Sequence, residues 1–181
     1  ETQPDIAHFH LLYHHLSPSI LPVLKKKGIP IVMTVHDYKL MCPNYLMYTE
    51  NDTCKRCKGH KYYNAIIHKC LKDSYAVSAY AAFEMSVHKL MQVYEKHVDT
   101  FIVPSVFMRD LMVEFGHNPT KIVVIPHFVD PQFLETAKQV ESIKAEKPYL
   151  LYFGRLSEEK GVDKILETMY IYKPGIALKI A

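Results

Sequence analysis

The chain has 181 residues, 49% of them hydrophobic, which is enough for one domain or parts of two with a buried core. Its formal net charge of +3, from 22 basic and 19 acidic side chains, argues against a dedicated nucleic-acid-binding protein. No apolar run approaches the length of about 18 residues that would predict a membrane span. The chain opens at Glu1 without a signal-peptide pattern and stops within an apolar run, so we expect an internal piece of a longer protein.

Apolar runs alternate with segments of helical period along the whole chain. The alternation predicts an α/β fold with parallel sheets, because parallel strands buried on both faces are nearly continuously apolar. The expected strands span residues 5–12, 30–36, 99–105, 121–126, 149–154 and 176–181. The expected helices span residues 17–28, 80–94, 106–115 and 162–169. The segment 37–73 is irregular, and a polar stretch near 129–147 indicates a domain junction.

Three helices carry specific expectations. Ser17 and Ser105 are each placed to cap the helix that follows, and Gly28 is placed to end the first one. In the helix over 80–94, large apolar side chains recur on one face and predict a core-facing surface, with a membrane-surface role as the weaker alternative. These side chains are Tyr80, Phe83, Val87, Leu90 and Tyr94.

All four cysteines lie in the irregular segment, in the pattern C-x(11)-C-x(2)-C-x(12)-C formed by Cys42, Cys54, Cys57 and Cys70. Four thiolates suit a closed tetrahedral zinc site. The loop is long and has no other evident means of ordering, so a bound metal would serve to fix its conformation. The alternative is four reduced thiols, because strong zinc motifs contain two C-x(2)-C pairs. The two readings carry about equal weight, and any metal is expected to be structural rather than catalytic.

The stretch LYFGRLSEEKG, residues 151–161, places two cations at the end of an expected strand. Gly154 allows close backbone approach, Arg155 offers paired hydrogen bonds to phosphate, and Lys160 adds a compact charge. The helix expected near Gly161 would add an amino-terminal end that favours anions. A phosphate-binding turn and a solvated surface turn are equally consistent with this spacing.

Five ordered blocks resemble glycosyltransferase family four, also called the group 1 glycosyltransferases, whose members have two facing Rossmann-like domains, the GT-B fold. The blocks are PDIAHFH, GIPIVMTVHDYKLMCPN, DTFIVPSVFMRDLMVEFG, KIVVIPHFVD and FGRLSEEKGVDKILE. The resemblance implies an α/β chain with part of an acceptor-side domain at 1–128, including a cysteine-containing insertion at about 37–73. It further implies a junction at 129–147 and the start of a nucleotide-sugar-binding domain at 148–181, both domains being incomplete.

The resemblance also implies a function and site residues. Gly154, Arg155 and Lys160 would bind the diphosphate of a UDP- or GDP-sugar donor, and His36 would act at the donor sugar or nearby phosphate. His10 and Asp37 are further cleft candidates, although a packed strand histidine is the preferred interpretation for His10. His127 stands where the family often has asparagine.

The implied reaction is hexosyl transfer with retention at the anomeric carbon, to a glycan or lipid-linked acceptor in polysaccharide or cell-surface glycoconjugate synthesis. No cofactor is expected to be required for catalysis, and the candidate zinc would be structural. No nucleic-acid partner is expected. The cytoplasm is the expected location, with peripheral association at the inner face of the membrane. The family's glycine-rich loop is expected upstream of Glu1 and its E-x(7)-E motif well beyond Ala181, so residues 1–181 alone are expected to be inactive.

Two other classes of function remain open on the sequence. One is a non-catalytic relative that retains the phosphate cradle. The other is a zinc-stabilised module that binds nucleic acid or protein, which the weak net charge and the α/β alternation disfavour.

Overall fold

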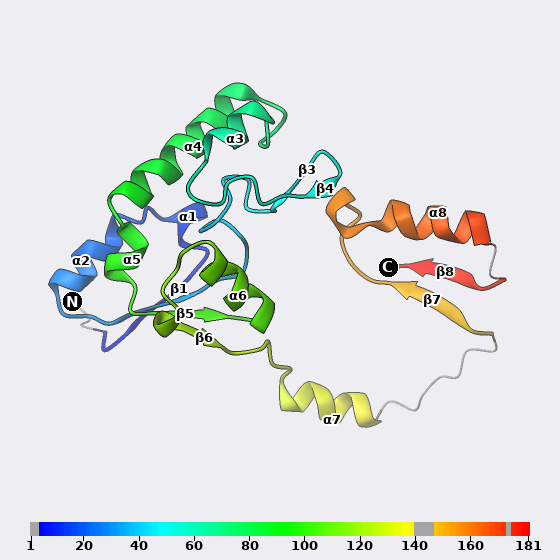
Figure 1. Ribbon diagram of the computed structural model, residues 1–181. Helices are drawn as coiled ribbons and strands as arrows, with labels where there is room; N and C mark the ends of the chain where they lie inside the picture. Colours follow the sequence, from blue (N-terminus) through cyan, green and yellow to red (C-terminus); the bar gives the residue numbers. More distant parts are fainter. Residues whose placement is uncertain (1–3, 140–146, 173–174) are drawn as a thin grey trace. The chain divides into compact units, whose positions relative to one another are not determined.

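The computed structural model describes residues 4–139, 147–172 and 175–181. The chain forms two compact units, Glu1–His127 and Phe128–Ala181, which are described separately below (Figure 1). Among the described residues, no helix is long and apolar enough to cross a membrane.

The first unit is built on a four-stranded parallel sheet with the strand order β1-β2-β5-β6. Its strands are β1 (Ala7–His10), β2 (Ile31–Thr34), β5 (Thr100–Val103) and β6 (Ile122–Val124). The register pairs His10 with Thr34 and Thr34 with Ile102, so the carboxyl ends of neighbouring strands lie at one edge. The predicted α/β class with a parallel sheet is confirmed.

Among the described residues, six helices lie in the chain segments between these strands, and some of them pack on the sheet. They are α1 (Leu12–His15), α2 (Ile20–Lys26), α3 (Tyr63–Ile67), α4 (Tyr75–Leu90), α5 (Val93–His97) and α6 (Val106–Glu114), with a 3-10 turn η1 (Pro119–Lys121). Helix α2 packs on β2, and α6 packs on β5 and β6. Ile31, Met33 and Val103 are fully buried, because parallel strands are covered on both faces.

The two predicted serine caps have different outcomes. The Ser105 hydroxyl accepts a hydrogen bond from the Met108 N–H at 3.2 Å, which confirms it as the cap of α6. The prediction for Ser17 is wrong, because α2 begins only at Ile20 and the Ser17 hydroxyl accepts from the Ser19 N–H instead. A turn through Pro18 takes up the intervening residues, and Gly28, with a φ of 74°, follows the end of α2 as expected.

The predicted core face of the helix over 80–94 is wrong. Tyr80, Phe83 and Leu90 are 72%, 68% and 86% exposed. The buried residues of α4 are small or flexible ones, namely Ser78, Ala81, Ala82 and Met85. Small side chains let α4 approach α3 closely, and the two helices lie side by side (Figure 1). The helix also ends at Leu90. Tyr94 is buried, but it belongs to the separate helix α5.

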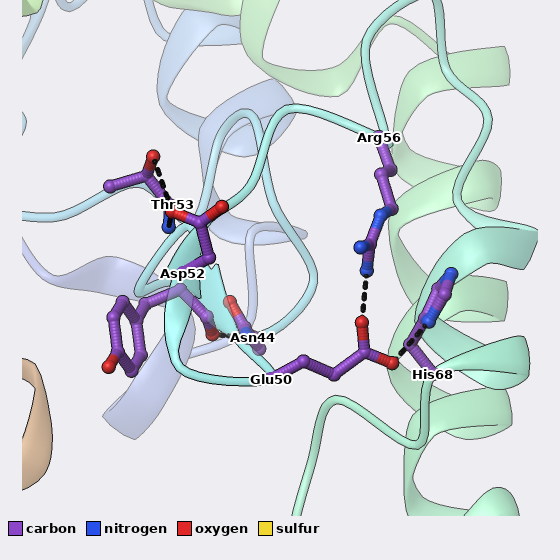
Figure 2. A network of polar contacts seen from close by, with 7 residues as sticks. Asn44, Glu50, Asp52, Thr53, Arg56 and His68 are labelled. Atoms are coloured by element: carbon purple, nitrogen blue, oxygen red, sulfur yellow. Dashed lines mark hydrogen bonds and ion pairs between the residues drawn. The ribbon is translucent and has the colours of Figure 1, made fainter.

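The irregular segment is ordered by polar contacts around a short hairpin of β3 (Tyr48–Thr49) and β4 (Asp52–Thr53). The side chain of Asn44 donates to the Tyr48 carbonyl at 2.8 Å and accepts from the N–H groups of Leu46 and Met47. At the hairpin turn, the Glu50 carboxylate binds Arg56 at 2.8 Å and His68 at 2.7 Å (Figure 2). The expectation that this loop lacks other means of ordering is therefore wrong.

The second unit contains one βαβ element, which Figure 1 shows as β7, α8 and β8. Its elements are α7 (Pro131–Gln139), β7 (Tyr149–Tyr152), a 3-10 turn η2 (Glu158–Lys160), α8 (Val162–Tyr172) and β8 (Ala177–Ile180). Strands β7 and β8 are parallel, as the sequence predicts. Helix α7 lies in the expected junction, and residues 140–146 of that junction lie outside the described residues.

Candidate functional site

Four histidines gather near the carboxyl edge of the four-stranded sheet. His8 and His10 are on β1, His36 follows β2, and His127 follows β6. Ligands in open α/β sheets bind at this edge, because strand ends and the loops after them converge there. The sequence predicted His36 and His10 for this region. It missed His127, although a polar residue closely following a parallel strand is a usable signal.

The four imidazoles form a continuous row of contacts that starts at a buried threonine. His8 Nε2 lies 2.7 Å from the Thr34 hydroxyl, and His10 Nδ1 lies 2.7 Å from His36 Nε2. The rings of His36 and His127 are parallel within 3°, with centroids 6.0 Å apart. His10 is exposed and paired with His36, so the interpretation of His10 as a packed strand histidine is wrong.

The environment keeps two of these histidines neutral. Partial desolvation of the ring, which is otherwise exposed, lowers the pKa of His36, and the nearby His10 and His127 lower it further, with Asp37 opposing the shift. Burial and the nearby His10 likewise lower the pKa of His8. Neutral imidazoles donate and accept hydrogen bonds but do not attract phosphate by charge. At neutral pH the rings of His8 and His36 are therefore suited to hydrogen bonds with hydroxyl groups.

Asp37 follows His36 directly and is tied back to the chain. Its carboxylate accepts a hydrogen bond from the Tyr13 hydroxyl and one from the Lys39 N–H at 3.0 Å. Burial, followed by the hydrogen bond and the charge of Asp37, raises the pKa of Tyr13 far above its ordinary value. Asp37 thus orders the loop that carries His36.

The four cysteines are free thiols near the β3–β4 hairpin. Cys42 and Cys57 are buried, and the Cys42 thiol donates to Asn44 Oδ1 at 3.0 Å. The interaction between the Cys42 and Cys57 side chains lowers the pKa of Cys42 and raises that of Cys57. Cys54 and Cys70 lie near enough to raise the pKa of Cys57 further. Within the described ranges, no three His, Cys, Asp or Glu side chains are arranged to hold a metal ion. Metal binding at these cysteines therefore stays a prediction.

In the second unit, the turn between β7 and α8 carries the two predicted cations. Gly154 has a φ of 153°, and a Cβ there would lie 3.2 Å from the Tyr152 hydroxyl, so the turn favours glycine. That hydroxyl donates to the Arg155 carbonyl at 2.6 Å and closes the turn. The Arg155 side chain is 80% exposed, with Glu159 Oε1 3.8 Å from its guanidinium. Lys160 is exposed and lies one residue before Gly161, after which α8 begins.

The first unit is thus a Rossmann-like α/β domain with polar side chains at the carboxyl edge of its sheet. The model of the family described as Glycosyltransferase Family 4 matches residues 1–133, and the chain belongs to that family. Its general class of activity is glycosyl transfer, which implies a sugar donor and an acceptor. The match ends before the turn that carries Arg155 and Lys160. No curated protein matches the chain.

Proposed function

We propose that this chain forms part of a retaining glycosyltransferase that uses a nucleotide-diphosphate sugar, with UDP or GDP as the nucleotide. The acceptor is a glycan or a lipid-linked glycan. The observation that carries this proposal is the β7–α8 turn, which presents Arg155 and Lys160 beside the amino end of an 11-residue helix. Exposed cations and helix N–H groups at one turn favour a diphosphate.

The same turn supports a role in catalysis. In the proposed reaction, an acceptor hydroxyl attacks the anomeric carbon from the face that the nucleotide leaves. The bond from that carbon to the diphosphate oxygen breaks, and its electron pair stays on the diphosphate. The acceptor proton passes to the departing phosphate. Arg155 and Lys160 stabilise the charge that develops there, which is electrostatic catalysis by fixed groups.

His36 is the proposed catalytic residue of the first unit. Its exposed ring, held by His10 at 2.7 Å, is suited to a hydrogen bond with a sugar hydroxyl or a phosphate oxygen. His10 and Asp37 act as positioning residues, since one contacts the ring and the other orders the following loop. His36→Gln keeps a donor and an acceptor but loses the ring. We expect it to lower kcat by about 100-fold in the transferase while leaving nucleotide affinity unchanged.

The diphosphate site is tested by calorimetric titration of the purified chain with UDP and with GDP. Arg155→Ala and Lys160→Ala should each weaken binding by about 10- to 100-fold, because a hydrogen bond to a charged group contributes about 1.5–3 kcal/mol. Lys164→Ala is the matched control, since Lys164 is an exposed lysine of α8 paired with Asp163 and Glu167. Equal affinities for all four proteins would contradict the proposal.

Sugar transfer and nucleotide binding separate the remaining alternatives. We propose that residues 1–181 alone transfer no sugar, so a measurable transfer rate from the purified chain would contradict this point. A longer form that binds nucleotide but transfers no sugar would identify a non-catalytic relative.

A structural zinc ion at Cys42, Cys54, Cys57 and Cys70 remains part of the proposal. The side chains would turn toward one another to complete a tetrahedral set. Elemental analysis of the purified chain should find one zinc per chain, and a chelator should lower its melting temperature. A metal-free chain with an unchanged melting temperature in chelator would rule this out.

Peripheral membrane association is proposed on the exposed apolar face of α4. Tyr80, Phe83 and Leu90 lie on this face, and Val87 lies half-buried between them. Aromatic and aliphatic side chains of this kind suit a membrane interface. Co-sedimentation with anionic vesicles should fall several-fold in a Phe83→Ser/Leu90→Ser variant, whereas unchanged sedimentation would reject the proposal.

A further inference from the structure

A small cavity in the first unit lies among α4, α5, the loop after β2 and the segment that follows α6. Its volume is about 20 Å³. A site for one water molecule requires at least about 10–15 Å³ on this scale, so the cavity has room for about one water but not for a sugar or a nucleotide. Its polar lining comes from Lys39, Lys89, Glu95 and His117. None of these residues belongs to the histidine row or to the β7–α8 turn.

Two residues of this lining each have a buried polar atom without a hydrogen-bond partner among the described residues. The atoms are His117 Nδ1 and Glu95 Oε2. His117 is only 6% exposed, burial lowers its pKa, and its ring forms a hydrogen bond with the Leu40 carbonyl. A neutral ring that donates to this carbonyl through Nε2 has Nδ1 as an acceptor. Because an unsatisfied buried acceptor is destabilising, both atoms require a donor.

The charges at the cavity disfavour an ion as its occupant. Lys89 Nζ lies 2.6 Å from Glu95 Oε1, and Lys39 Nζ lies 2.8 Å from Glu84 Oε2. An anion would meet the two acceptors, and a cation would meet the two ammonium groups. The occupant is therefore expected to be uncharged and to donate hydrogen bonds.

We propose that one internal water molecule occupies this cavity and donates one hydrogen bond to Glu95 Oε2 and one to His117 Nδ1. The two O–H groups of water match the two acceptors in number, and its size matches the volume of the cavity. This bridge joins α5 to the segment that follows α6. Through the bond between the His117 ring and the Leu40 carbonyl, it also fastens the loop after β2, which carries His36. The inference does not depend on the proposed donor site in the second unit.

The direct test is a crystal structure of the full chain at a resolution that shows ordered waters. One isolated water peak should lie about 2.7–3.2 Å from both Glu95 Oε2 and His117 Nδ1. An empty cavity, a peak within reach of only one acceptor, or a direct contact between the carboxylate and the ring would overturn the proposal.

Hydrogen exchange tests whether the water fastens the loop. The N–H groups of Met41 and Cys42 bond the Tyr38 carbonyl at 2.9 and 2.8 Å, so their exchange rates report on this loop. Glu95→Met and His117→Phe each remove one acceptor and keep a side chain of similar length or shape. Each should speed exchange at these two amides by about tenfold, because losing either acceptor releases the water and leaves the other unsatisfied.

A double variant and a matched control separate the water from its surroundings. Glu95→Met combined with His117→Phe should speed exchange by much less than the product of the two single effects, since both act through one water. Lys89→Met breaks the ion pair with Glu95 but keeps both acceptors, so it should change exchange by less than either single variant does. Effects that multiply in the double variant, or an equal effect in Lys89→Met, would contradict the bridge.

Discussion

The two units use the same kind of strand and bury it to different degrees. In β2, Ile31 and Met33 are fully buried, whereas Leu150 and Leu151 of β7 are 47% and 61% exposed. Among the described residues of the second unit, only Val162 is buried. The apolar runs in the two strands look alike in the sequence. The difference shows that an apolar strand becomes core only when further layers cover it.

The largest effect expected from this comparison is at the sheet itself. Met33→Ala should lower the free energy of unfolding by about 2–5 kcal/mol, because it leaves a cavity in a packed core. Leu151→Ala should cost less than about 1 kcal/mol, because its side chain remains largely in water. Urea denaturation, with hydrogen exchange followed separately at β2 and β7, measures both. Comparable costs at the two positions would show that β7 is as well covered as β2.

A second comparison sets the two faces of α4 against each other. Ala82 is 4% exposed and packs with Cys57, Tyr62 and Met85, whereas Phe83 is 68% exposed. Ala82→Leu should destabilise the first unit by about 1–3 kcal/mol through overpacking. Phe83→Ser should change stability by no more than about 0.5 kcal/mol. Thermal unfolding measures both, and a larger loss in Phe83→Ser would restore the face that the sequence predicted as core.

A smaller effect is expected at an ion pair that anchors the sheet of the first unit. Asp99 accepts from the Ile31 N–H at 2.8 Å and binds Lys25. Burial raises the pKa of Asp99, but the hydrogen bonds from Lys25 and Ile31 outweigh it and leave the pKa lowered. A lowered folded-state pKa contributes stability above the unfolded-state value of about 4, and that stability is lost as the pH falls below it.

In Asp99→Asn, the free energy of unfolding should therefore fall less steeply as the pH drops below about 4. Denaturation between pH 3 and pH 7 checks this. Asp163→Asn is the control from the second unit, since Asp163 is an exposed aspartate 3.9 Å from Lys164. A curve unchanged in Asp99→Asn would mean that the pair does not stabilise the sheet.

The smallest expected effect is the change in stability with pH that comes from the histidine row of the first unit. The turn with Arg155 and Lys160 in the second unit contains no histidine. The pKa values of His8 and His36 are lowered in the folded chain, so the unfolded chain binds more protons just below pH 6.5. Stability should fall as the pH drops from about 6.5 to 5.5. His10→Gln should weaken this fall, since His10 contributes to both shifts. A steeper fall in that variant would contradict the electrostatic account.

Local chemistry explains why some features could be predicted. Ser105 caps α6 because its hydroxyl accepts a hydrogen bond from a backbone N–H in the first turn of the helix. This local bond forms regardless of what the helix packs against. Gly154 and Gly161 sit at positive φ, which other residues rarely adopt. Ser17, by contrast, does not cap α2, because the chain forms a turn through Pro18 before the helix begins. A helix start at Pro18 and a turn at Pro18 are both compatible with the local sequence.

The sequence by itself determined the alternation of strands and helices, the parallel sheet class, the resemblance to the family and the cation turn. These depend on residue order and backbone preference. Only the tertiary structure decided that His127 joins His36 and that α4 buries its small residues instead of its aromatic ones. It also decided that a buried carboxylate oxygen of Glu95 and a ring nitrogen of His117 have no hydrogen-bond partner among the described residues. Such facts depend on which distant segments come together, and no local pattern encodes the shape and partners that those segments provide.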